Sequence, residues 1–466
     1  MARSANAGGG AACDGYLRAI WSAAGGPAAL PAPLAWRGAG SLPSIFAVTD
    51  LAAAAIGAAG LAIAELIGLR HGGAPAVAVD RRLASFWFDT TLRPVGWKLP
   101  PARDAVTGDY QAADGWIRLH ANAPHHRAAI LRVLDCAAGR DNVAGAVAQW
   151  NALDLENAIV EAKGCAALMR SQEAWVAHPQ GAAVAGEPLL WRTLAPAAAA
   201  PGWAIPRARP LQGVRVLDLT RIIAGPVATR FLAGYGAEVL RLDPPAWDEP
   251  VAAPELTLGK RCGRIDLRST EGRRLFRQLL RDADVLVHGY RSDALGALGF
   301  DAEQRRRINP GLVDVSLDAY GWTGPWKARR GFDSLVQMSC GIADAGMRRL
   351  GRPTPTPLPV QALDHATGYL LAAAAVRGLA ERVRSGSGGE ARASLARTAA
   401  LLVQGVAAAD AAPLQPETRA DCTMPSEMTA WGRARRVNAP LEVAGAPMAW
   451  DLPAGPLGAA PAAWLA

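Results

Sequence analysis

The feature that most constrains the fold is a regular alternation of short apolar runs and helical segments between residues 211 and 400. The apolar runs cover residues 214–219, 238–242, 264–267, 285–287 and 312–317. Strands that alternate with helices pair in parallel, and the helices cover both faces of the sheet. The sequence therefore predicts an α/β fold with a doubly wound parallel sheet, in which ligands bind at the carboxyl ends of the strands.

The composition is that of a globular protein, with 51% hydrophobic and 19% charged residues in a chain of 466. Only four of the 49 basic residues are lysines, and the net charge is +8. An arginine bias of this breadth is more typical of codon usage than of a binding surface, so we predict no nucleic-acid binding. An excess of arginine does suit an anionic small-molecule substrate.

The cysteines and the apolar stretches exclude several other classes. The six cysteines are scattered, without a C-x-x-C pair, so we predict no metal site and reduced thiols. No positively charged region followed by an apolar run stands at the start of the sequence, so we expect a cytoplasmic protein. The apolar stretch 51–64 is shorter than the roughly 20 residues of a membrane span, and it predicts a buried helix and no membrane association.

Two segments of the sequence resemble each other. Residues 50–82 and residues 364–397 each run from an aspartate through an alanine-rich helix and a glycine-rich turn to a short strand. This pattern indicates a weak internal repeat. Chance similarity within an alanine-rich chain is the alternative.

The turn after the first apolar run has the sequence Ile222-Ile223-Ala224-Gly225-Pro226. It lacks the G-x-G-x-x-G pattern, which disfavours NAD or FAD bound in the usual way. A Gly-Pro turn that opens a helix still exposes backbone N–H groups at the positive helix end, and these suit a phosphate or an adenine-bearing tail. A tight turn without a ligand is the alternative.

Two further segments are candidates for contact with an anionic ligand. Lys260 and Arg261 are adjacent cations before the third apolar run, and such a pair can bind phosphates, although a solvated basic turn is the commoner explanation. Tyr320 and Gly321 open the glycine-rich segment 320–326 after the fifth run. Glycines at strand ends let the backbone approach a ligand closely, and they also serve packing.

Asp364 stands directly before an alanine-rich helical stretch. An aspartate at this place is most often an N-cap. The functional alternative is a carboxylate nucleophile at a helix start, where the helix dipole keeps it ionised. Asp50 holds the matching place in the first copy of the repeat.

Taken together, these segments resemble the family III CoA-transferases, the group of formyl-CoA and carnitine CoA-transferases with the related 2-methylacyl-CoA racemases. The resemblance is carried, in order along the chain, by residues 211–243, 259–267, 283–290, 298–300, 309–310, 319–325 and 363–370. The family implies a doubly wound CoA-binding domain, a second, smaller α+β domain and an interlocked homodimer. It implies an acyl-CoA and a small carboxylic acid as substrates, with no permanently bound cofactor.

By position, Asp364 resembles the catalytic aspartate of the family. The resemblance implies that its carboxylate attacks an acyl-CoA thioester, forms a mixed anhydride and then an aspartyl-CoA thioester, and passes CoA to an acceptor acid. With the glycine-rich segment included, the candidate CoA-binding residues are Ile222, Ile223, Ala224, Gly225, Pro226, Lys260, Arg261, Tyr290, Arg291, Tyr320 and Gly321.

The sequence departs from the family pattern at three places. These are Pro244-Pro245, where family members often have Arg or Lys, Gly289-Tyr290 in place of an Asn-aromatic pair, and Phe332-Asp333, where racemase members have a His before an Asp. Without that histidine, proton shuttling at the α-carbon is disfavoured. The alternatives to a transferase are therefore an acyl-CoA racemase or epimerase, and an inactive CoA-binding paralogue.

The order of the segments is unusual for the family, because residues 106–195 resemble the part that normally follows the catalytic half. We therefore predict a fused or permuted chain. Its parts are a loosely ordered leader (1–44), a partial copy of the large-domain half (45–105), a small domain (106–200), the large CoA-binding catalytic domain (201–430) and a C-terminal return segment (431–466).

Overall fold

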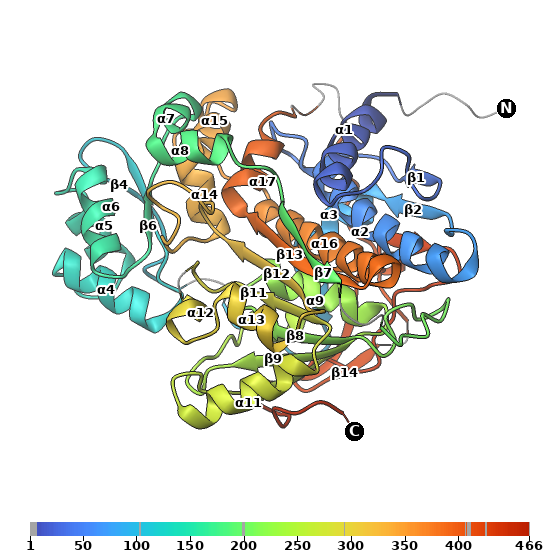
Figure 1. Cartoon of the computed structure of the whole chain (residues 1–466). Helices are drawn as coiled ribbons and strands as arrows, with labels where there is room; N and C mark the ends of the chain where they lie inside the picture. The colour runs from blue at the N-terminus through green and yellow to red at the C-terminus, as the bar shows by residue number, and fades with distance from the viewer. Residues whose placement is uncertain are drawn as a thin grey trace.

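A sheet of seven strands organises the computed structural model, which describes residues 7–101, 104–197, 201–292, 294–405, 407, 412–424 and 426–465 (Figure 1). The strands are β7 (Trp191–Ala197), β8 (Arg215–Leu219), β9 (Glu238–Asp243), β10 (Lys260–Arg264), β11 (Val285–His288), β12 (Val313–Asp318) and β13 (Ser387–Ser394). Their order is β10-β9-β8-β11-β12-β13-β7. All neighbours are parallel except β13 and β7. The prediction of an α/β fold around a mostly parallel sheet is confirmed.

Helices cover both faces of this sheet. Val216 of β8 lies in one hydrophobic cluster and Leu217 in another, because successive side chains of a strand point to opposite faces. The first cluster includes α9 (Ala224–Gly234), α16 (Ala362–Ser385) and α17 (Leu395–Leu402), and the second includes α11 (Thr270–Arg281) and α12 (Ala294–Ala297). Helix α13 (Ala302–Ile308) contacts α11. The alternating pattern of the sequence therefore predicts this part of the fold correctly.

The N-terminal part of the chain repeats the order of elements found at the far end of the large sheet. Helix α2 (Val48–His71), strand β2 (Val77–Asp80) and helix α3 (Arg81–Trp87) follow one another as α16, β13 and α17 do. Each long helix has 24 residues and ends at a glycine in the left-handed conformation, Gly72 or Gly386. The predicted repeat is confirmed in its order of elements.

The strand pairing repeats as well. Strand β2 is parallel to β1 (Leu34–Arg37) and antiparallel to β16 (Leu441–Val443). In the same way, β13 is parallel to β12 and antiparallel to β7. Because pairing partners come from distant parts of the chain, chance similarity of alanine-rich sequences does not explain this second agreement.

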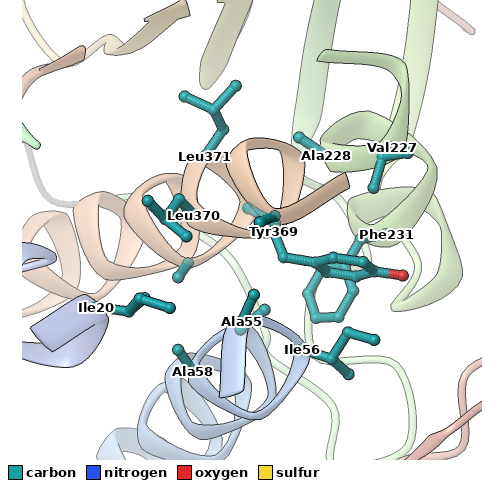
Figure 2. Packing of buried hydrophobic residues seen from close by; sticks show 14 of the residues in the cluster. Ile20, Ala55, Ile56, Ala58, Val227, Ala228, Phe231, Tyr369, Leu370 and Leu371 are labelled. Atoms are coloured by element: carbon teal, nitrogen blue, oxygen red, sulfur yellow. The ribbon is translucent and has the colours of Figure 1, made fainter. Parts of the chain in front are cut away.

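The two long helices α2 and α16 pack against each other in the interior. By length and composition α2 could cross a membrane, but 94% of its most apolar window is buried inside the protein. Figure 2 shows Tyr369 of α16 beside Phe231 of α9, with Ala55 of α2 nearby. A helix that is apolar on all sides is buried, so the expectation of a buried helix over residues 51–64 is confirmed.

The N-terminal segment differs from the expected loosely ordered leader over the residues that the structure describes. Helix α1 (Ala7–Ala23) packs on α2, and its Cys13, Ile20 and Trp21 are buried. The run of glycines at residues 8–10 lowers the helix propensity of this segment. Packing on an apolar neighbour outweighs that propensity, and the sequence pattern does not reveal such a neighbour.

Residues between 106 and 168 form a separate hydrophobic cluster, drawn in teal at one end of the molecule in Figure 1. Its elements are β4 (Gly108–Gln111), β5 (Trp116–Leu119), β6 (Ala166–Leu168), α4 (Pro124–Leu134), α5 (Arg140–Val147) and α6 (Ala152–Glu161). A hairpin at Asp114-Gly115, a residue pair typical of tight turns, joins β4 and β5. Strand β7 lies in the range predicted for the small domain but belongs to the large sheet.

Two short helices follow this cluster, α7 (Gln172–Ala177) and α8 (Pro179–Ala185). The segment 178–181 has the proline and glycine of a typical loop, but it begins α8. The His178 ring accepts a hydrogen bond from the Gln180 N–H, and Pro179 occupies the first helical position. Because proline is favoured at that position, this segment begins a helix.

The C-terminal segment returns to the rest of the molecule. Strands β14 (Glu427–Thr429) and β15 (Gly432–Arg436) form a small sheet with β3 (Leu92–Pro94), after the short helix η1 (Arg419–Asp421). Glu255, in α10 (Ala253–Leu256), accepts hydrogen bonds from Thr91, Arg230 and Arg436. One buried carboxylate thereby joins four distant parts of the sequence.

One strand of the large sheet is displaced from its expected position. The sequence analysis places the third strand at residues 264–267, whereas β10 covers Lys260–Arg264. This strand lies at the edge of the sheet, where the Cys262 carbonyl oxygen accepts from the N–H of Ala460. An edge strand tolerates polar residues, so its apolar pattern is weak.

The close approach of α9 and α16 can be tested at Gly368. A Cβ atom added there would lie 2.5 Å from the carbonyl oxygen of Ala224. We expect Gly368→Ala to lower the free energy of unfolding by about 1–3 kcal/mol, because the backbone of α9 must move. Thermal unfolding followed by circular dichroism measures the effect.

The control is Gly145→Ala on α5, where no atom lies within 4 Å of the added Cβ. Alanine favours a helix over glycine by up to about 1 kcal/mol, so this variant should melt at or above the wild-type temperature. A Gly368→Ala protein that melts as high as the control would contradict the packing of α9 on α16.

Candidate active site

Three of the predicted ligand-binding segments follow neighbouring strands at the same edge of the sheet. The turn 222–226 follows β8, Tyr290 and Arg291 follow β11, and Tyr320 and Gly321 follow β12. Strands β8, β11 and β12 are adjacent and parallel. The structure therefore brings these segments to the carboxyl edge, where doubly wound sheets bind their ligands.

The turn 222–226 is strained and opens α9. Ile222 has a φ of 68°, a left-handed conformation that costs a β-branched residue about 1–3 kcal/mol. Its N–H donates to the Glu249 carboxylate at 2.7 Å, and Glu249 pairs with Arg241 of β9, also at 2.7 Å. Ile223 is the N-cap, and no side chain caps the helix. A buried ion pair thus holds an uncapped helix start, with Ala224, Gly225 and Pro226 in its first turn, at the sheet edge.

Arg221 and Tyr290 form a stacked group beside this turn. The Arg221 guanidinium donates to the Tyr290 hydroxyl at 2.9 Å and lies over the rings of Tyr290 and Trp247, at 5.1 Å and 4.9 Å from their centroids. Arg291 is exposed next to Tyr290. A planar guanidinium between aromatic rings can bind phosphate or stack on a base. Sequence analysis missed Arg221 and Trp247, although Arg221 directly precedes the turn.

Lys260 and Arg261 begin β10, at the opposite end of their strand from the carboxyl edge. The Lys260 ammonium is buried and donates to Asp218, to Thr229 and to the carbonyl oxygen of Pro226. Arg261 donates to the carbonyl oxygen of Ala463. The structure therefore brings Lys260 to the predicted turn 222–226, where its ammonium pairs with Asp218, while Arg261 binds the C-terminal segment.

The glycine-rich segment 320–326 is held by one side chain from α8 and one from the loop that follows it. Gln180 of α8 donates to the carbonyl oxygens of Tyr320 and Thr323. Glu187 accepts from the N–H groups of Trp322 and Thr323. The Tyr320 side chain is itself buried, and Gly321 has a φ of 108°. The backbone of this segment, more than its side chains, is what a ligand at the sheet edge would meet.

Asp364 lies in the first turn of α16 and does not cap it. Gln361 is the N-cap, and no side-chain cap hydrogen bond is made there. The Asp364 side chain is only 6% exposed, and among the described residues no hydrogen bond or cation reaches its carboxyl group. Burial, together with the negative charge of Asp333, raises the pKa of Asp364 well above its usual value. Burial and the charge of Asp333 therefore oppose ionisation of Asp364, whereas the helix dipole alone is expected to favour it.

Asp333 provides the cap that α16 needs. It is the first residue of α14 (Asp333–Ser339), which precedes α15 (Ile342–Arg349). Its carboxylate accepts from the N–H groups of Leu363 and Asp364 at 2.9 and 3.0 Å. Burial raises the pKa of Asp333 to about 6. Two carboxyl groups thus share the buried start of one helix.

Asp50 shows how differently the first copy of the repeat is arranged. It lies in the first turn of α2, whose N-cap, Ala47, has φ and ψ of −76° and 59°, close to the −78° and 63° of Gln361. The Asp50 carboxylate, however, is bound by the guanidinium of Arg81 at 2.5 Å and by the thiol of Cys13 at 3.2 Å. The backbone is the same, but a cation neutralises Asp50, and none of the described residues supplies one to Asp364.

Known proteins are similar to this chain over its central and C-terminal part. Residues 211–430 match the model of CoA-transferase family III. The chain is 34% identical over 203 residues to a succinate–glutarate CoA-transferase of Agrobacterium fabrum, covering 39% of this chain and 50% of the relative. It is 34% identical over 197 residues to a probable fatty acyl-CoA transferase of Mycobacterium tuberculosis, and the match covers 38% of this chain and 48% of the relative.

A crystal structure of a CAIB/BAIF family protein from Brucella suis is 27% identical and covers 48% of this chain and 65% of that one. Its TM-score of 0.38 is too low to compare the two folds. The chain spans about half the length of the curated relatives that it matches. The matched region contains the turn 222–226, the stacked Arg221 and Tyr290, and both Asp333 and Asp364. Residues 211–430, just under half of the chain, are therefore similar to CoA-transferase family III.

Proposed function

We propose that the protein transfers CoA from an acyl-CoA thioester to a carboxylic acid, with Asp364 as the nucleophile. The observation that carries the proposal is the state of the Asp364 carboxyl group, which is buried, without a cation partner and at the start of a central helix. A purely structural buried aspartate is normally paired, as Asp50 is with Arg81. An unpaired one is a candidate for chemistry.

A desolvated carboxylate is a stronger nucleophile than a hydrated one, because less water must be removed before its oxygen attacks. The 6% exposure of Asp364 leaves part of its surface open to a thioester. Its position in the first turn of α16 directs the positive end of the helix dipole towards the oxyanion that forms there.

The proposed reaction balances without an added reagent. The Asp364 carboxylate oxygen attacks the thioester carbonyl carbon, the C–S bond breaks, and CoA leaves as a thiolate. The thiolate attacks the Asp364 carbonyl carbon of the anhydride, which releases the first acid and forms an aspartyl-CoA thioester. The acceptor carboxylate attacks that thioester, and the thiolate released then attacks the acceptor carbonyl. Acceptor acyl-CoA and the original carboxylate result.

The stacked Arg221 and Tyr290 and the uncapped start of α9 support the placement of the CoA nucleotide at the carboxyl edge of the sheet. Guanidinium groups and helix N-termini both favour phosphates. The named substrates of the relatives make succinyl-CoA with glutarate the first donor and acceptor pair to assay. A panel of other carboxylic acids against the same donor then defines the acceptor.

Replacement of Asp364 tests the nucleophile. We expect Asp364→Asn to lower CoA transfer roughly 10⁴-fold or more, because the amide cannot form the anhydride. CoA binding should remain, and hydroxylamine added with acyl-CoA should convert Asp364 of the wild-type protein, but no residue of the variant, to a hydroxamate detectable by peptide mass spectrometry.

Asp50→Asn is the matched control. It makes the same change at the same helix position, but it leaves Arg81 buried without a partner, which costs about 3–5 kcal/mol of stability. CoA transfer should therefore persist in Asp50→Asn, although this variant is less stable, and it should vanish in Asp364→Asn. Turnover in Asp364→Asn rules out Asp364 as the nucleophile. In the wild-type protein, α-proton exchange without a hydroxamate adduct favours a racemase. Tight CoA binding with neither reaction favours an inactive paralogue.

The pH dependence of stability gives a separate test of the buried pair. An unfolded aspartate has a pKa of about 3.9, while the pKa of Asp333 is about 6 in the folded protein and that of Asp364 is well above its usual value. The folded protein binds more protons, so its stability falls as pH rises from about 4 through 6 and beyond. Asp364→Asn removes this loss, so its melting temperature relative to wild type should rise between pH 4.5 and pH 8. A difference that stays constant or shrinks contradicts the pKa assignment.

A further inference from the structure

The carboxylate of Asp333 has three hydrogen-bond donors and is 1% exposed. The N–H groups of Leu363 and Asp364 donate to its Oδ2 atom, and the amide of Gln337 donates to its Oδ1 atom at 2.5 Å. The Gln337 carbonyl oxygen in turn accepts from the N–H of Leu358 at 2.7 Å. One chain of hydrogen bonds therefore fixes both the start of α16 and the segment that leads into it.

The first copy of the repeat shows that a helix of this kind begins without such a carboxylate. In α2 the N–H of Val48 donates to the carbonyl of Phe46 at 2.8 Å, and in α16 the N–H of Ala362 donates to that of Val360 at 2.8 Å. In the described part of the chain, no side chain accepts from the N–H groups of Thr49 and Asp50. Helix formation alone therefore does not require Asp333, and its place beside Asp364 needs another explanation.

We propose that Asp333 is the positioning residue for Asp364, holding the backbone that carries the nucleophile and placing a second negative charge beside it. This inference rests on the proposed function. Two carboxylates at one buried site cannot both ionise at low cost. The charge of Asp333 therefore delays ionisation of Asp364 and makes the carboxylate more basic once it forms. The raised pKa values of both groups agree with this arrangement.

The charged groups around the pair leave it without a neutralising partner. Arg118 of β5 lowers the pKa of Asp333, but less than burial raises it. His365, next to Asp364, has its pKa lowered to about 3 by burial and is therefore neutral. Phe332 stacks on His120, whose pKa burial also lowers to about 3.

Charged groups on the other elements packed against α14 and α16 are bound to partners of their own. These pairs are Asp344 with Arg348 on α15, Arg230 of α9 with Glu255, Asp50 of α2 with Arg81, Asp314 of β12 with Arg305, Asp318 of β12 with the N–H of Gly321, Glu390 of β13 with Arg306, and Arg397 of α17 with the carbonyl oxygen of Glu187. Among the described residues, no hydrogen bond or ion pair joins any of them to the Asp333 or Asp364 carboxyl groups.

The pH profile of kcat/KM for acyl-CoA separates this role from a merely structural one, because it reports the ionisation of the free enzyme. Asp333→Asn keeps an acceptor for the N–H groups but removes the charge. We expect the acid limb of the Asp333→Asn profile to move to lower pH by about one unit. If each rate is divided by the plateau rate of the same protein, the variant should then be about tenfold faster than wild type at pH 5. Asp333→Ala removes the acceptor as well, and its plateau kcat should fall below that of Asp333→Asn.

Asp344→Asn is the control, because it removes a neighbouring aspartate that pairs with Arg348. Its acid limb should coincide with that of wild type. An acid limb of Asp333→Asn that also coincides with wild type overturns the electrostatic role. A plateau kcat of Asp333→Ala equal to that of Asp333→Asn overturns the positioning role.

A stability cycle keeps the inference testable if no transfer occurs and the proposed function fails. Melting temperatures of wild type, Asp333→Asn, Asp364→Asn and the double variant are compared at pH 5 and pH 8. Relief of repulsion by either single change makes the effects non-additive, and we expect the non-additivity to grow with pH. Additive effects at both pH values show that the two carboxyl groups do not interact, whatever reaction the protein performs.

Discussion

The burial of helix α16 is the constraint on which the rest of the structure depends. The helix lies against α2, α9 and the large sheet, and the residues of its middle, 370–376, are all apolar and buried. Its first turn carries Asp364, which is buried as well. A carboxyl group carried into the core by its own helix must be paired, protonated or used for chemistry. In this molecule the pairing cation is absent among the described residues and a second carboxylate takes its place.

The repeat makes the same point by contrast. Helices α2 and α16 share their length, their N-cap conformation and their glycine ends, and the strands that follow them have equivalent neighbours. Arg81 and Cys13 bind the aspartate of the first copy. One backbone design therefore carries either a stable ion pair or a reactive carboxyl group, and the choice depends on side chains contributed by other elements.

Much of the fold follows from local pattern, and much of the site does not. Helix α11, from Thr270 to Arg281, follows from its local sequence, because Ser269 caps it and its apolar residues recur at helical spacing. The role of Asp333 depends on contacts with residues about thirty positions away, and no local pattern encodes them. The raised pKa of Asp364 has no local signal either, since burial is a property of the whole fold. Lys260 looked like a phosphate ligand from its neighbour Arg261, but its ammonium neutralises the buried Asp218.

The central claim is that the Asp364 carboxyl group receives the CoA thiol, and a crystal structure of the protein soaked with a slowly reacting acyl-CoA tests it most directly. The account predicts that the thioester sulfur lies in contact with the Asp364 carboxyl group and that the nucleotide extends over the carboxyl edge of the sheet near Arg221 and Tyr290. A sulfur atom bound out of reach of that carboxyl group, or a nucleotide at the opposite edge beside Arg261, would contradict it.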